Sequence, residues 1–73
     1  MFLKYNRENG RFGVMKKKGW DCDGLHCGQT FQVKINGRWV NTRIEKTSDW
    51  YLVDLNLASA QLEHLLFRWN DEV

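Results

Sequence analysis

Hydrophobic and polar residues alternate through the middle of the chain, from residue 31 to residue 53. Two alternating runs, FQVKI and RWVNTRI, flank the pair Asn36-Gly37. Both residues of this pair tolerate positive φ, which is typical of the type I′ turn whose twist matches that of a β-hairpin. We therefore expect a two-residue turn that pairs Val33 with Val40 across two antiparallel strands.

This register sorts the side chains of the hairpin onto two faces, because opposed residues of an antiparallel pair point to the same side of the sheet. The apolar face is expected to hold Phe31, Val33, Ile35, Val40 and Ile44. The opposite face, which we call the outer face, is expected to hold Lys34, Trp39 and Arg43.

A third strand is predicted in the segment DWYLV, after a turn within residues 46–49. A loop of two or four residues places Tyr51 and Val53 on the apolar face. Trp50 then lies with Trp39 on the outer face, which is the arrangement we expect. A three-residue loop would exchange the faces of this strand, because side chains alternate along it.

The two ends of the chain complete an all-β prediction. The runs FLKY and RFGVM flank a turn cluster at residues 6–10 and predict a second hairpin. Towards the C-terminus, we expect a short helical turn at about Ser59 to Glu63 and a closing strand at about Leu65 to Trp69, with a single helix as the alternative. Residues 1–73 should form one domain, an SH3-like five-stranded barrel or a strongly bent antiparallel sheet.

The composition indicates a folded domain without an enclosed active site. Of the 73 residues, 42% are hydrophobic, and four Trp, four Phe and two Tyr are among them. A chain of this length buries only about 60% of its unfolded surface, so we expect neither an enzyme nor a small-molecule substrate. No apolar run approaches the roughly 18 residues that cross a bilayer, which predicts a soluble cytoplasmic protein without membrane contacts.

The cysteines and histidines provide ligand types suited to zinc, but their spacing does not favour a metal site. Cys22 and Cys27 have four residues between them, the widest spacing usual for zinc-binding pairs, and the adjacent His26 and Cys27 point apart in an extended segment. We expect free thiols, no metal and no cofactor, and His64 is the remaining candidate ligand. A small zinc-binding domain is the least favoured alternative.

Three segments together resemble a small family of uncharacterised bacterial proteins that are often encoded near mobile elements. These segments are DGLHCGQTFQV at 23–33, INGRWVNTRIE at 35–45 and DWYLV at 49–53. The resemblance covers about residues 10–55. It implies a compact β-barrel-like domain of unknown function.

The outer face of the hairpin is the strongest candidate for a binding site. Trp39 lies across from Lys34, and Arg43 and Trp50 are expected nearby. An aromatic ring offers a stacking surface to a base, while neighbouring cations bind phosphates. We therefore expect a binding or adaptor module whose first candidate partner is nucleic acid.

Two alternatives remain open for this face. A protein partner is the first, because Trp and Arg side chains anchor protein interfaces. In the second, Trp39, Trp50 and Leu52 form a second hydrophobic cluster that the C-terminal segment covers.

A run of three cations provides a further candidate contact at Lys16, Lys17 and Lys18. Runs of this length are usually solvated turns, so a binding role needs supporting neighbours. The net charge of +2 is too small to indicate nucleic-acid binding by itself. The distribution of the cations over the surface therefore matters more than their number.

Overall fold

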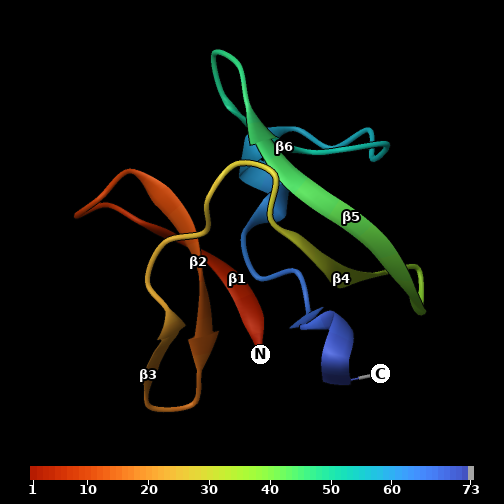
Figure 1. Cartoon of the computed structure of the whole chain (residues 1–73), viewed down its shortest axis with the longest axis horizontal. Coiled ribbons are helices and arrows are strands. Elements are labelled where there is room, and N and C mark those ends of the chain that lie inside the picture. Colours follow the sequence, from red (N-terminus) through yellow and green to blue (C-terminus); the bar gives the residue numbers. More distant parts are fainter. Residues whose placement is uncertain (73) are drawn as a thin grey trace.

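Seven β-strands form two antiparallel sheets in the computed structural model of the protein, which describes residues 1–72. The first sheet has the order β1-β2-β3 and contains β1 (Phe2–Asn6), β2 (Arg11–Lys16) and β3 (Gly19–Cys22). The second has the order β6-β5-β4-β7 and contains β4 (Thr30–Ile35), β5 (Arg38–Lys46), β6 (Trp50–Leu52) and β7 (Phe67–Arg68). Two short 3-10 helices, η1 (Ser59–Leu62) and η2 (Asn70–Glu72), follow β6 and β7 (Figure 1).

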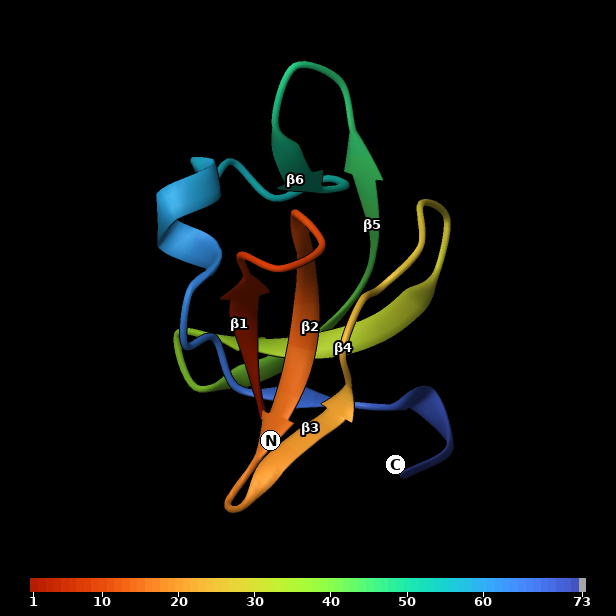
Figure 2. The ribbon, with the colours of Figure 1, turned by 90° about the vertical axis from the view of Figure 1, so that its left-hand side faces the viewer.

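Backbone hydrogen bonds join the two sheets along β1. The N–H of Leu3 donates to the carbonyl of Leu65 at 2.9 Å, and the N–H of His64 donates back to the carbonyl of Leu3 at 2.8 Å. The N–H of Phe67, on β7, donates to the carbonyl of Met1 at 2.9 Å. Figure 2 shows β1 and β2 crossing in front of β4. The first sheet therefore packs across the second, and the core lies between them.

The predicted fold class is confirmed, but the predicted number of strands is wrong. All regular strands are antiparallel, as expected, but the described chain has seven of them and not five. The strand without a counterpart among the predicted segments is β3, whose sequence GWDC contains Gly and Asp, two residues depleted in strands. Within residues 1–72 the strands do not close into a barrel, since β3 and β6 end their sheets without pairing. The SH3-like barrel is therefore not confirmed.

The central hairpin has the predicted turn and register. Asn36 and Gly37 have φ values of 51° and 80°, so both occupy the left-handed region that a type I′ turn requires. Val33 pairs with Val40, and Lys34 pairs with Trp39. The prediction from the alternating pattern is confirmed.

The apolar face of the hairpin contributes to a core that also contains residues of β1, β2, β6, η1 and β7. The core residues are Leu3, Phe12, Val14, Leu25, Phe31, Val33, Ile44, Trp50, Leu52, Leu62 and Phe67. The rings of Phe31 and Phe67 lie with their centroids 4.7 Å apart, so β4 and β7 contact each other through aromatic packing as well as backbone pairing. Ile35 and Val40, nearer the turn, are only half-buried.

The face predicted for β6 is wrong. The pairs Lys46↔Trp50 and Ile44↔Leu52 leave three residues, 47–49, in the loop, which turns Trp50 and Leu52 into the core. Trp50 is only 6% exposed, whereas Tyr51 points outward and is 36% exposed. The indole Nε1 of Trp50 donates to the carbonyl of Gly10 at 2.8 Å. This bond provides the partner that a buried indole N–H needs, and so favours the inward arrangement.

The C-terminal segment forms the predicted helical turn and closing strand. η1 (Ser59–Leu62) precedes β7 (Phe67–Arg68), so the single helix considered as the alternative is wrong. His64 has a φ of 68°, which a right-handed helix cannot accommodate. No helix within residues 1–72 is long and apolar enough to span a membrane.

The turn geometry predicts a specific cost for one substitution. A Cβ at Gly37 would meet no atom within 4 Å, so only backbone strain opposes a side chain there. Gly37→Val should lower the free energy of unfolding by about 1–3 kcal/mol, because β-branched residues resist positive φ. Urea unfolding measures this loss, with Gly37→Asn as the control because Asn tolerates positive φ. Equal stability of the Val and Asn variants would contradict the assigned turn.

Candidate nucleic-acid interface

The outer face of the hairpin, which β4 and β5 form together, carries an indole ring. Trp39 on β5 pairs with Lys34 on β4, and the Lys34 Nζ lies 5.7 Å from the centroid of the indole ring. Trp39 is half-buried and Lys34 is exposed. A cation within about 6 Å of an indole face is attracted by the ring quadrupole. The predicted neighbours are therefore in contact.

Arg68 is a second cation at the same ring, and sequence reasoning missed it. Because Arg68 on β7 pairs with Gln32 on β4, it projects onto the outer face. Its Cζ lies 4.4 Å from the centroid of the Trp39 ring. Its Nε donates to Gln32 Oε1 at 2.6 Å, and Gln32 Nε2 donates to Asn41 Oδ1 at 2.9 Å. A chain of polar contacts thus crosses three strands beside the ring.

The alternation of β7 contained a signal that could have identified Arg68. Phe67 is buried, so the next residue of an extended strand must point to the opposite face. Assigning that face to the hairpin also requires the pairing of β7 with β4, which joins residues 36 positions apart. The local sequence pattern does not contain this pairing.

Arg43 lies on the same face, two and four positions from Asn41 and Trp39 along β5. Its side chain is 52% exposed, and its Nε lies 3.0 Å from Glu45 Oε2. An exposed ion pair of this kind contributes about 0–1 kcal/mol, so a phosphate can compete for the guanidinium at small cost.

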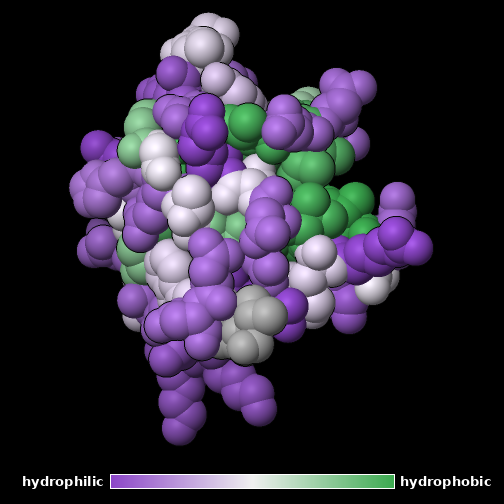
Figure 3. Space-filling view, turned by 45° about the vertical axis from the view of Figure 1, so that its right-hand side comes forward, coloured by the Kyte–Doolittle hydropathy of each residue, from purple (hydrophilic) through white to green (hydrophobic). Residues whose placement is uncertain are grey.

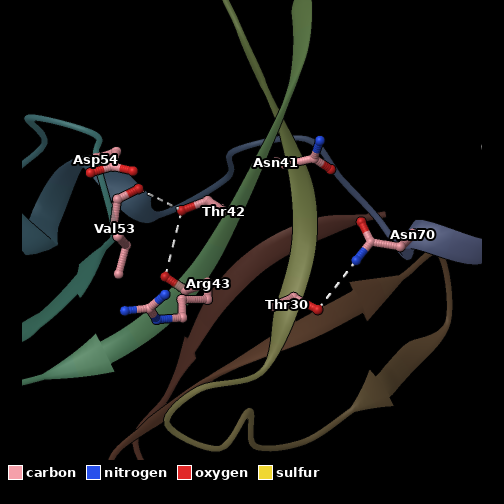
Figure 4. Close-up of a pocket in the computed structure, with 7 residues that line it drawn as sticks. All are labelled: Thr30, Asn41, Thr42, Arg43, Val53, Asp54 and Asn70. Carbon is pink, nitrogen blue, oxygen red and sulfur yellow. Dashed lines mark hydrogen bonds between the residues drawn. The ribbon is translucent and has the colours of Figure 1, made fainter.

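A polar hollow of about 370 Å³ adjoins this end of the face (Figure 4). Its lining residues are Thr30, Asn41, Thr42, Arg43, Val53, Asp54 and Asn70. Asn70 Nδ2 donates to Thr30 Oγ1 at 3.3 Å, and Thr42 Oγ1 donates to the carbonyl of Val53 at 2.9 Å. The hollow therefore presents amide, hydroxyl and carboxylate groups, which can exchange hydrogen bonds with the polar edge of a ligand.

Trp50 does not belong to the outer face, although the sequence placed it there. The three-residue loop turns its ring into the core, where it is 6% exposed. Leu52 is fully buried in the same core. The second hydrophobic cluster that these residues were to form with Trp39 is therefore also wrong. The C-terminal segment reaches Trp39 through the charged side chain of Arg68.

The lysine run is not part of the outer face. Lys16 ends β2, and Lys17 and Lys18 form the turn to β3. Figure 1 shows the β2–β3 turn and the β4–β5 turn at different corners of the molecule. The three lysines line a separate hollow of about 480 Å³ with Met1. The structure therefore does not bring these cations to the ring of Trp39.

Asp21 links the first sheet to the C-terminal segment. The Trp69 Nε1 donates to Asp21 Oδ2 at 2.8 Å, and the Lys16 ammonium lies 2.9 Å from Asp21 Oδ1. The hydrogen bond from Trp69 and then the one from Lys16 lower the pKa of the Asp21 carboxyl from its ordinary value, because both stabilise the charged form. Lys16 is therefore engaged in a structural contact.

The cysteines and histidines are spread over the structure. Cys22 is half-buried and Cys27 exposed, and neither forms a disulfide. The ring of His64 lies 5.6 Å from that of Phe2. Within residues 1–72 no group of three or more His, Cys, Asp or Glu side chains is placed to hold a metal ion. The absence of a bound metal stays a prediction.

The fold and the outer face define a small all-β domain with a basic and aromatic surface. The family model "Domain of unknown function (DUF5348)" matches residues 2–68, and the chain belongs to this family. A crystal structure of a protein from Ruminococcus gnavus is similar, with 42% sequence identity and a TM-score of 0.77 over 90% of this chain and 93% of that chain. No curated protein matches the chain. The proximity to mobile elements implied by the sequence resemblance stays a prediction.

The two tryptophans of the second sheet should respond differently to truncation. Trp50→Ala should lower the free energy of unfolding by about 3–5 kcal/mol, because it empties a buried site. Trp39→Ala should cost much less, since its ring is half-buried on the outer face. Urea unfolding followed by circular dichroism compares the two variants. Equal losses would show that Trp39 is a core residue.

The lowered pKa of Asp21 predicts a pH-dependent contribution to stability. A carboxyl with a lowered folded-state pKa stabilises the fold above its unfolded pKa, about 3.9 for Asp, and this stability is lost as the pH falls through the folded value. Asp21→Asn should therefore unfold at less urea than the parent near neutral pH, and the difference should shrink as the solution is acidified. A difference that stays constant with pH would assign the effect to the uncharged hydrogen bond.

Proposed function

We propose that the protein binds single-stranded nucleic acid through the outer face, which comprises Gln32, Lys34, Trp39, Asn41, Arg43 and Arg68. The observation that carries this proposal is the Trp39 ring with two cations beside it. Among the described residues, the ion pairs are Lys16–Asp21 and Arg43–Glu45, so no described carboxylate neutralises Lys34 or Arg68. An aromatic ring beside unneutralised cations suits a ligand that is both flat and anionic.

Each part of the face has a role in such a complex. A base stacks on the Trp39 ring, and stacking of this kind contributes about 1–3 kcal/mol per base. Lys34 and Arg43, which are exposed, bind the phosphates on either side. The amide of Asn41 lines the polar hollow two positions along β5 from Trp39, where it can donate to or accept from a base edge. The proposed activity is binding, without a catalytic step.

A protein partner is the second candidate. Figure 3 shows apolar surface (green) gathered on the side of the molecule that is on the right in Figure 1. Ile35, Leu55 and Leu57 pack against the core but remain half-buried. A partner that covers apolar surface would bind with little dependence on salt, whereas binding to phosphates weakens steeply as salt is added. Salt dependence therefore separates the two candidates.

Substitutions on the outer face test the proposal in two distinct ways. Trp39→Ala should weaken binding to a labelled single-stranded oligonucleotide by about 1–3 kcal/mol through lost stacking. Lys34→Ala and Arg43→Ala should each weaken binding and reduce the slope of log affinity against log salt, by about 0.7 per lost phosphate contact. Fluorescence anisotropy at several salt concentrations measures both effects.

The lysine run supplies the matched control for this experiment. Lys17→Ala removes one exposed charge at the β2–β3 turn and should leave the affinity nearly unchanged. Unchanged binding in a folded Trp39→Ala variant, together with weaker binding in Lys17→Ala, would move the interface to the lysine run. No binding by the parent at low salt would reject a nucleic-acid partner.

A further inference from the structure

Among residues 1–72, Arg68 is the only outer-face cation that contacts both an aromatic ring and an uncharged hydrogen-bond partner. Its Cζ lies 4.4 Å from the centroid of the Trp39 ring, and its Nε donates to Gln32 Oε1 at 2.6 Å. Gln32 is only 9% exposed and is itself fixed by its bond to Asn41. Contacts from two directions therefore set both the position and the orientation of the guanidinium.

This arrangement leaves the terminal amino groups of Arg68 available. A guanidinium has five N–H donors, and the hydrogen bond to Gln32 uses the one on Nε. No described carboxylate forms an ion pair with Arg68. Two parallel donors on a fixed plane match a ligand with two neighbouring acceptors. Nucleic acid offers several such ligands, among them the phosphate oxygens and the O6 and N7 atoms of guanine, the pair of base acceptors that arginine contacts most often.

The position of Arg68 favours the base over the phosphate. Its guanidinium lies against the Trp39 ring, so a base that contacts this ring under the proposed function would be a neighbour of the guanidinium. A base that accepts two hydrogen bonds from the terminal amino groups of Arg68 would lie beside the same ring. Lys34 and Arg43 are more exposed than Arg68 and are better placed for phosphates.

We infer that Arg68 selects guanine in single-stranded nucleic acid bound to the outer face. This inference rests on the proposed function, because it names the base that the same face recognises. Gln32 has a positioning role, since it orients the guanidinium without contacting the base. The bidentate contact requires both guanine acceptors, so removal of N7 alone should remove most of the selectivity.

The test compares short uridine oligonucleotides that contain guanosine, adenosine or 7-deazaguanosine at one central position. The parent protein should bind the guanosine oligonucleotide about five- to 150-fold more tightly than the adenosine one. The 7-deazaguanosine oligonucleotide lacks only the N7 acceptor and should lose most of this preference. This comparison uses the unaltered protein, so it does not depend on whether a variant folds.

Two matched variants complete the experiment. Arg68→Gln should remove the preference for guanosine, whereas Arg43→Gln removes the same charge from the same face and should weaken all three oligonucleotides equally. Equal affinity of the parent for all three would overturn the inference and leave the proposed function in place. A preference that survives in folded Arg68→Gln would also overturn it. No binding of any oligonucleotide at low salt would reject the proposed function itself.

Discussion

The Asn36-Gly37 turn is the constraint on which the rest of the structure depends. Both residues are in the left-handed region, and the turn fixes the register of β4 and β5. A slip of one residue would exchange every inward and outward side chain of a strand. The same register therefore buries Val33 in the core and places Lys34 opposite Trp39 on the outer face. The geometry of this turn therefore determines both which side chains enter the core and which form the candidate site.

The features that the sequence predicted correctly are those encoded locally. The hairpin register follows from one dipeptide and two alternating runs, and the closing strand from the alternation of Leu65, Phe67 and Trp69. The face of β6 was wrong because it depends on whether the loop has an odd or even number of residues, and the polar segment KTSD gives no signal for either. The arrangement observed has a long-range contact, from the Trp50 indole to the carbonyl of Gly10. No local pattern encodes a bond between residues 40 positions apart.

Part of the candidate site could be predicted because local sequence determines the register of the hairpin. Lys34, Trp39 and Arg43 all lie on the hairpin, so its register was enough to group them. Arg68 comes from a two-residue strand near the C-terminus, and only the pairing of β7 with β4 brings it to the ring. The cation nearest to Trp39 is thus the one that sequence reasoning missed. When a site combines residues from strands that are distant in the sequence, its residues can be named only after the pairing of those strands is known.

The short length of the chain explains why core and site are so closely connected. Chains of this size bury only about 60% of their unfolded surface, so few residues can serve one purpose alone. β7 shows this directly, because Phe67 packs on Phe31 in the core while the adjacent Arg68 contacts Trp39 outside. Trp69 then packs edge-on against Phe67 and donates to Asp21 in the first sheet. The contacts that attach β7 to both sheets therefore also hold the Arg68 guanidinium against the Trp39 ring. A change that loosens the packing of the core should displace this guanidinium while the domain is still folded.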